Sequence, residues 1–311
     1  MGSCLRVILP VLNAMPYLTE ALASLEAQTF RDFEVCLWDN GSTDGSVEEA
    51  RRWIPSRLPG RVVTGRPLPL HECLAAMVEE AQTEFVARMD GDDVSLPIRF
   101  EKQIEYFLAN KALGIVGGQC PLMDQGGKLL GVSHPGPLGH EDIVTLMMVR
   151  SALTHPALMF RRDAILDAGN YRHPKPVEDL DLYLRMAQIC KFQNLSETIL
   201  HYRIHPLSIC QSDLAGQSRQ ASDVVDAYSK KIYGISPRDF QQLRAKKGSA
   251  AREMLKSAAF RSGGDYKKSY SIAMSPTFTY VGRCMTSEVD YFSKLTFKFL
   301  DAMRSVFPAK S

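Results

Sequence analysis

Two groups of acidic residues stand directly after short apolar runs. Asp39 follows the run 33–38, and Asp90, Asp92 and Asp93 follow the run 85–89. Both runs are typical of buried strands, and in an open α/β sheet ligands bind beyond the carboxyl ends of the strands. Carboxylates gathered at such an edge repel one another unless a cation holds them, and their hard oxygen atoms suit Mg²⁺ or Mn²⁺. The spacing predicts one metal site, with a diphosphate as the natural partner of the metal.

These acids also have a structural interpretation. An aspartate before Gly–Ser often caps a turn, so on the residues alone Asp39 is as well explained by a turn as by a ligand site. Asp90, Asp92 and Asp93 could form a solvated turn, which is the weaker explanation for three acids within four residues after a buried strand.

A second group of polar residues lies further along the chain. Glu178 and Asp179 precede an amphipathic stretch over 180–186, and so fall at the N-terminus of a predicted helix, where acids are favourable by about 0.3–1 kcal/mol. His155 and His205 each stand before a proline at the end of a predicted strand. Histidines in such places are more often hydrogen-bonded structural residues than ligands.

The elements that must position these residues alternate between strand and helix. Strands are predicted over 5–9, 33–38, 61–64, 85–89, 114–120, 157–160 and 199–204. Helices are predicted along 18–25, around Val47, over 70–81, from Pro97 onward, over 143–149 and over 180–186. This alternation predicts an α/β fold with a mainly parallel sheet and helices on both faces.

Composition narrows the class of protein. The chain has 311 residues, 45% of them hydrophobic, which is enough for a large domain with an extension. A formal net charge of +2 does not indicate a nucleic-acid partner. Seven scattered cysteines without a CxxC pair are typical of reduced, mostly buried thiols in a cytoplasmic protein. The apolar run 7–12 is too short for a signal peptide, and no stretch is long enough to span a membrane.

The pattern changes near residue 212. We expect a catalytic domain over 1–212, with a nucleotide-binding half over 1–120 and an acceptor half over 121–212, and a basic helical extension over 213–311. Within the extension, apolar residues recur at helical spacing over 292–307. Such a helix could lie on a membrane surface, but packing on the domain or on a second subunit is the commoner use of the pattern. The oligomeric state stays open.

Several motifs, taken in order, resemble those of the family 2 glycosyltransferases, which have the GT-A fold. The matching segments are Val7–Asn13, Gln28–Glu34, Asp39–Ser46, Ala87–Asp93, Leu96–Pro97, Arg99, His155–Pro156, Gly169–Arg172, Glu178–Leu182 and Tyr202–His205. Each segment is weak evidence alone, whereas their order and spacing over about residues 5–210 make the set specific.

The resemblance implies roles on the donor side. Asp39 would bind the base of a nucleotide-sugar, Pro10 would pack near that base, and Arg88 would support the nucleotide. Asp90 would face the ribose, and Asp92 would bind the metal, Mn²⁺ or Mg²⁺, that bridges the diphosphate.

It also implies roles on the acceptor side. Asp179 would be the general base of an inverting transfer, and His155 and Glu178 would lie near the acceptor. His205 would be a further metal ligand. Three departures from the family pattern, Asn40, Leu12 and Ala75, bear on the identity of the base, for which uracil is our first choice and guanine or thymine the alternatives.

The sequence thus predicts a metal-dependent inverting glycosyltransferase that moves a hexose or an N-acetylhexosamine from a UDP-sugar to a glycan or lipid-linked glycan, as in polysaccharide or lipopolysaccharide synthesis. A cytoplasmic location is expected, with peripheral contact to the inner face of the membrane if the C-terminal helix binds lipid. One alternative is a nucleotidyltransferase, although the usual glycine- and lysine-rich phosphate loop is missing near the first strand. Another is a non-catalytic protein that binds a nucleotide-sugar or a glycan through a decayed site.

Overall fold

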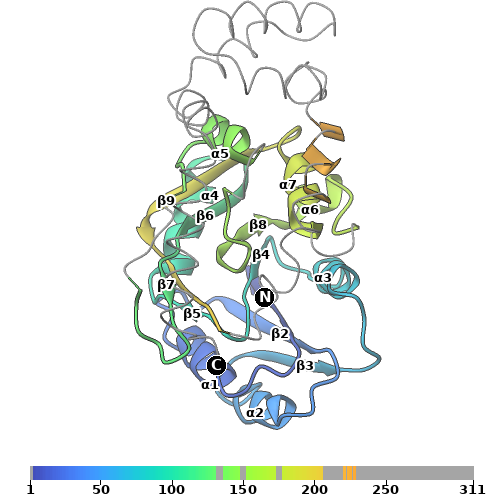
Figure 1. Ribbon diagram of the computed structural model, residues 1–311, viewed down its shortest axis with the longest axis vertical. Coiled ribbons are helices and arrows are strands. Elements are labelled where there is room, and N and C mark those ends of the chain that lie inside the picture. The colour runs from blue at the N-terminus through green and yellow to red at the C-terminus, as the bar shows by residue number, and fades with distance from the viewer. Residues whose placement is uncertain are drawn as a thin grey trace, which may run out of the picture. The chain divides into compact units, whose positions relative to one another are not determined.

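The computed structural model describes residues 3–130, 136–147, 152–172, 177–205 and 220–228, the last without 222 and 226 (Figure 1). Two compact units divide the chain. The first comprises Met1–His140 and Leu153–Ile204, and the second comprises Glu141–Ala152 and His205–Ser311. All the predicted site residues except His205 fall in the first unit.

A seven-stranded sheet forms the centre of the first unit. Its strands, in chain order, are β1 (Leu5–Val11), β2 (Phe33–Asp39), β3 (Gly60–Thr64), β4 (Phe85–Arg88), β6 (Leu113–Gln119), β8 (Met159–Arg161) and β9 (Lys191–Thr198). They lie in the order β3-β2-β1-β4-β8-β6-β9. All neighbours are parallel except β8, which is antiparallel to β4 and β6. The prediction of a mainly parallel sheet is therefore confirmed.

A smaller sheet begins just after the acidic segment 90–93. It consists of β5 (Val94–Ser95), β10 (Leu200–Arg203) and β7 (Leu122–Met123), in that spatial order. β10 is antiparallel to β5 and parallel to β7. The acidic segment therefore connects the two sheets and is fixed at both of its ends.

Seven α-helices are defined within the described residues. They are α1 (Leu18–Glu26), α2 (Ser46–Trp53), α3 (Leu70–Glu79), α4 (Arg99–Ala109), α5 (His140–Met147), α6 (Arg162–Asp167) and α7 (Glu178–Met186), with a short 3₁₀ helix at His155–Ala157. None of the helices in the described ranges is long and apolar enough to cross a membrane.

Both faces of the large sheet carry helices, as predicted. The odd-numbered residues of β1, Leu5 to Val11, share one buried cluster with side chains of α1, α2 and α4. The helix α3 packs on β1 and β2 from the other face, because its buried Cys73, Leu74, Met77 and Val78 do not belong to that cluster. Alternation of side chains along a strand explains how one strand serves both layers.

Two predictions of strands need correction. β1 was expected to end before Pro10 but continues to Val11. Pro10 faces the β4 side, where pairing already stops at Ile8 opposite Arg88, so its missing N–H removes no bond of the sheet. β9 was not predicted at all, because Lys191, Gln193, Asn194, Ser196 and Glu197 hide its apolar residues.

The predicted extension over 213–311 lies outside the described residues, except for helical residues within 220–228. The expectation of an amphipathic helix over 292–307, and with it the choice between membrane contact and packing, also lies outside them. The boundary at residue 212 stays a prediction.

Candidate active site

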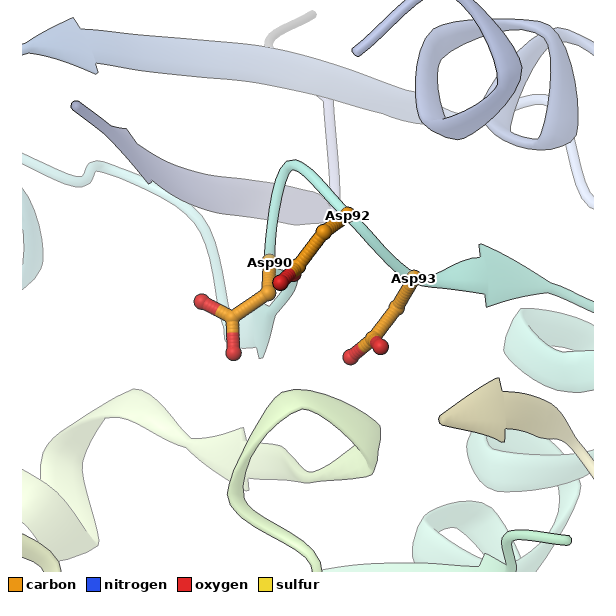
Figure 2. Close-up of side chains that lie close together, drawn as sticks. All are labelled: Asp90, Asp92 and Asp93. Carbon is orange, nitrogen blue, oxygen red and sulfur yellow. The ribbon is translucent and has the colours of Figure 1, made fainter. Parts of the chain in front are cut away.

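The three aspartates that follow β4 form a compact group. Oxygen atoms of Asp90, Asp92 and Asp93 lie within 4.8 Å of one another. In Figure 2 their side chains extend to the same side of the turn. Asp90 and Asp92 are half-buried, and Asp93 is 1% exposed. Three converging carboxylates fit a hard divalent cation, and their mutual repulsion would be relieved by one.

Asp90 pairs with the arginine at the end of β4. Nη1 of Arg88 lies 2.5 Å from Oδ2 of Asp90, and the arginine is buried. Burial alone lowers the pKa of Arg88, but the Asp90 carboxylate outweighs it and raises that pKa above its ordinary value. The buried Arg99 on α4 donates to the carbonyl of Arg88 at 2.7 Å, which fixes the backbone there. Arg88 is therefore a fixed positive charge beside the acidic group.

Asp93 belongs to the aspartate group and also accepts a hydrogen bond from the backbone. Its Oδ1 accepts the backbone N–H of Arg203 at 2.8 Å, while its Oδ2 is buried without a hydrogen-bond partner among the described residues. Burial raises the pKa of Asp93 well above its usual range, and the neighbouring Asp92 and Asp90 add to this. Asp90 and Asp92 are therefore the more available ligands.

Pro10 and Asp39 lie at the same edge of the sheet. In the register of β1 and β2, Pro10 is opposite Trp38 and Val11 is opposite Asp39. Only β1 separates β2 from β4, so Asp39 stands about 10 Å from the acidic group, since adjacent strands are about 4.8 Å apart. The sequence prediction that both acidic segments reach one edge is correct.

The carboxylate of Asp39 organises the turn that follows it. It accepts the backbone N–H of Gly41 at 3.1 Å and that of Ser42 at 3.2 Å, and it is 5% exposed. The turn-capping interpretation is thus confirmed. It does not compete with a ligand role, because a carboxylate has further lone pairs for an incoming N–H.

The hydrogen bonds of Asn40 explain why the chain departs from the family pattern at this position. Its amide nitrogen donates to the carbonyl of Leu68 at 2.8 Å, and its amide oxygen accepts the N–H of Leu68 at 2.7 Å. A carboxylate could accept but not donate, so an aspartate here would lose one of the two bonds. Asn40 fastens the segment before α3 to the end of β2.

The second acidic pair occupies the first turn of α7. Oδ1 of Asp179 accepts the backbone N–H of Leu180 at 2.7 Å. Burial, followed by repulsion from Glu178, raises the pKa of Asp179 to about 7, and Arg88 opposes this rise. Glu178 is 7% exposed, and its Oε2 has no hydrogen-bond partner in the described parts of the chain. Arg88 thus acts electrostatically both on Asp90, in the aspartate group after β4, and on Asp179, in the acidic pair of α7.

His155 lies among aromatic residues beside this pair. Its Nε2 and the hydroxyl of Tyr171 are hydrogen-bonded at 2.8 Å, and its ring meets that of Tyr183 edge-on, with centroids 6.0 Å apart. Burial, then Arg88, lowers the pKa of His155 well below its ordinary value, so the imidazole is neutral. Both tyrosines have pKa values raised mainly by burial. The sequence indicates no role for either: Tyr183 lies on the amphipathic helix α7 and cannot be told from a core residue, and Tyr171 lies in a loop whose sequence does not show that it contacts His155.

His205 follows β10 closely and is buried, at 9% exposure. The group of converging carboxylates comprises the three aspartates alone among the described residues. The role of His205 as a metal ligand therefore stays a prediction.

A doubly wound sheet with an aspartate group after its fourth strand and a second acidic pair on a later helix defines the GT-A class of sugar-transferring enzymes. The chain belongs to glycosyl transferase family 2, whose family model matches residues 6–167. It is therefore a glycosyltransferase.

Two named relatives agree with this assignment. The chain is 32% identical over 216 residues to the O-antigen biosynthesis glycosyltransferase WbnJ of Escherichia coli, covering 68% of this chain and 84% of that one. It is 34% identical over 174 residues to the amylovoran biosynthesis glycosyltransferase AmsE of Erwinia amylovora, covering 55% and 64%.

Solved structures share the fold. TarS of S. aureus, in complex with UDP-GlcNAc, superposes with a TM-score of 0.57 at 15% identity, covering 98% of this chain and 90% of that one. The mannosyltransferase PcManGT of Pyrobaculum calidifontis, in complex with GDP-Man and Mn²⁺, gives a TM-score of 0.53 at 15% identity, covering 100% and 89%. At this identity the similarity bears on the fold alone, and it agrees with the predicted GT-A architecture.

Proposed function

We propose that the protein is a metal-dependent inverting glycosyltransferase that moves a sugar from a nucleotide-sugar donor to a glycan or lipid-linked glycan acceptor. The observation that carries the proposal is that Arg88 pairs with Asp90 of the aspartate group and also acts electrostatically on Asp179, a carboxyl whose pKa is raised to about 7. A metal-and-diphosphate site and a proton acceptor are the two parts that an inverting transfer needs.

On the donor side, Asp39 and Pro10 would hold the nucleotide base, and Asp90 would face the ribose. Asp92, with Asp90 beside it, would supply carboxylate oxygens to Mn²⁺ or Mg²⁺, and His205 is the proposed further ligand. A bound divalent cation would offset the charge that builds on the departing diphosphate. The buried charge of Arg88, which pairs with Asp90, would support the nucleotide.

On the acceptor side, Asp179 would take the proton of the acceptor hydroxyl as that oxygen attacks the anomeric carbon. A sugar hydroxyl is a poor nucleophile near neutral pH, and a positioned base contributes roughly 10²–10⁴-fold to the rate. A base works best with a pKa near the working pH, which the buried setting of Asp179 supplies. Glu178 and His155 would contact the acceptor.

The substrate class follows from relatives rather than from geometry. WbnJ and AmsE carry names that refer to O-antigen and amylovoran biosynthesis, which favours a surface polysaccharide or lipopolysaccharide as the product. UDP-hexose or UDP-N-acetylhexosamine is our first choice of donor. We infer a cytoplasmic location, where nucleotide-sugars are made.

A binding panel tests the donor site without knowledge of the acceptor. UDP, GDP and dTDP, with their common sugar conjugates, would be titrated calorimetrically in Mn²⁺, Mg²⁺ or EDTA. We expect metal-dependent binding of one nucleotide, UDP, and its loss in Asp92→Asn but not in Asp163→Asn, a control whose side chain is 85% exposed on α6. Equal affinity in Mn²⁺ and EDTA would contradict the metal role. Absence of binding under every condition would favour a decayed site.

A further inference from the structure

Arg203, the last residue of β10, is buried beside the acidic group, at 2% exposure. Its Nε–H donates to the backbone carbonyl of Asp92 at 2.7 Å. Its own backbone N–H donates to Oδ1 of Asp93 at 2.8 Å. One residue of the small sheet therefore holds two consecutive residues of the acidic segment, one by the side chain and one by the backbone.

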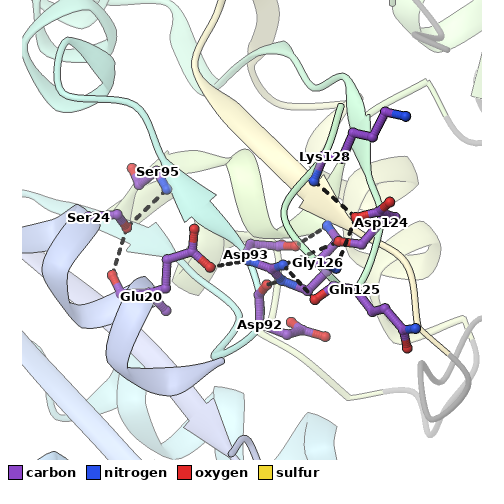
Figure 3. A network of polar contacts seen from close by, with 11 residues as sticks. Glu20, Ser24, Asp92, Asp93, Ser95, Asp124, Gln125, Gly126 and Lys128 are labelled. Atoms are coloured by element: carbon purple, nitrogen blue, oxygen red, sulfur yellow. Dashed lines mark hydrogen bonds and ion pairs between the residues drawn. The ribbon is translucent and has the colours of Figure 1, made fainter. Parts of the chain in front are cut away.

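The remaining donors of the guanidinium reach two other segments. Nη1 donates to the carbonyls of Asp124 and Gln125, at 3.2 and 3.3 Å, and Nη2 forms an ion pair with Glu20 of α1. The guanidinium also lies over the ring of Tyr17, 4.7 Å from its centroid. Figure 3 shows Glu20, Asp92, Asp93, Asp124 and Gln125, which come from separate parts of the chain, gathered in one network.

Two of the segments that Arg203 contacts are held in place by further hydrogen bonds. Oδ1 of Asp124 accepts the N–H groups of Gly126 and Lys128, both at 2.9 Å, which closes the turn after β7. Oγ of Ser24 on α1 accepts the N–H of Ser95 in β5 at 3.0 Å. Arg203 therefore connects the backbone of Asp92 to the turn after β7 and to α1, both of which are held by hydrogen bonds of their own.

We propose that Arg203 is a positioning residue for the metal site, setting the place of the Asp92 carboxylate through the Asp92 carbonyl. The inference rests on the proposed function, in which Asp92 binds the metal. A guanidinium carries five N–H donors on three nitrogen atoms, whereas a lysine ammonium carries three on a single nitrogen and so cannot keep all four contacts, to the carbonyls of Asp92, Asp124 and Gln125 and to Glu20. Loss of a group that orients a metal ligand typically costs 10–100-fold in metal affinity.

The test is the variant Arg203→Lys. Two quantities are measured: the Mn²⁺ concentration that gives half-maximal UDP binding, and kcat and KM with the donor that the binding panel identifies. We expect that concentration to rise about tenfold or more. We expect kcat at saturating Mn²⁺ and donor to change far less, since Arg203 does not contact Asp179. A general loss of stability would lower the fraction of active protein without moving the Mn²⁺ dependence.

Arg161→Lys is the matched control. Arg161, like Arg203, lies at the end of a strand, donates to backbone carbonyls, here those of Leu113 and Phe107, and pairs with a glutamate, Glu84. It stands opposite Phe85, the first residue of β4, and so at the edge of the sheet away from the acidic group. We expect its Mn²⁺ dependence to equal that of the wild type.

A second variant covers the case in which Arg203→Lys does not fold. Glu20→Ala keeps the arginine but removes its charge partner, whose side chain is 53% exposed. We expect a shift in the same direction and of smaller size. An unchanged Mn²⁺ dependence in folded Arg203→Lys, or failing that in Glu20→Ala, would overturn the positioning role alone. Wild-type protein that binds no nucleotide with any metal would overturn the proposed function and this role together.

Discussion

At the scale of single residues, Asp179 carries the strongest prediction about chemistry. Asp179→Asn keeps the shape and the bond from Leu180 but cannot take a proton, so we expect kcat to fall by roughly 10²–10⁴-fold with the donor KM nearly unchanged. Steady-state transfer kinetics measure both. The control is Asp163→Asn, an exposed aspartate on α6, for which we expect wild-type values. Unchanged turnover in Asp179→Asn would remove this residue as the base.

The setting of Asp179 also predicts a pH profile. A base acts in its ionised form, so with a pKa of about 7 we expect kcat/KM to rise tenfold per pH unit below 7 and to level off above it. Glu178 on the same helix raises this pKa and Arg88 on β4 lowers it, while Tyr171 and Tyr183 face the group uncharged. Glu178→Gln should therefore move the midpoint to lower pH. A wild-type midpoint near 4, the ordinary value for a carboxyl, would contradict the assignment.

The sequence predicted where the acidic residues meet better than it predicted their partners. Acids after apolar runs identify Asp39 and Asp90 because strand order brings their ends to one edge. Arg203 lies within a matching motif, but no pattern in the chain indicates that its side chain would meet Glu20, 183 positions earlier. Partners of this kind depend on how the small sheet packs, which local periodicity does not encode.

At the scale of elements, the pairing of β3 with β2 depends on Gly60. This residue has φ of +142°, and a Cβ there would lie 2.0 Å from the carbonyl oxygen of Val35. We expect Gly60→Ala to lower the free energy of unfolding by about 2–5 kcal/mol, from backbone strain and overlap with β2. Urea denaturation measures it. The control is Gly65→Ala, where a Cβ meets no atom within 4 Å. Equal stability of both variants would show that β3 can shift without cost.

The elements themselves could be predicted where apolar residues recur regularly. The buried face of α1 comprises Leu18, Ala21, Leu22 and Leu25, as the spacing indicates, with Ser24 in addition. β5 and β7, each of two residues, are too short to show any period, and they exist only because β10 pairs with them. Strands that form only because a strand distant in the sequence pairs with them are thus the ones that the sequence does not predict.

At the scale of the whole molecule, buried thiols should report ligand binding. Cys36, Cys73 and Cys120 are buried, and burial is the first cause that raises each pKa, to about 12 for Cys73 and Cys120. The thiolate is the reactive form, so alkylation requires opening of the fold. A ligand at 100 times its Kd stabilises the native state by about 2.7 kcal/mol, so we expect UDP with Mn²⁺ to slow labelling about 100-fold. Mass spectrometry of the peptides carrying these cysteines measures the rate. EDTA and Asp92→Asn should each abolish the protection. If the rate of labelling were the same with and without the ligand, local openings would expose these thiols before the whole fold opens.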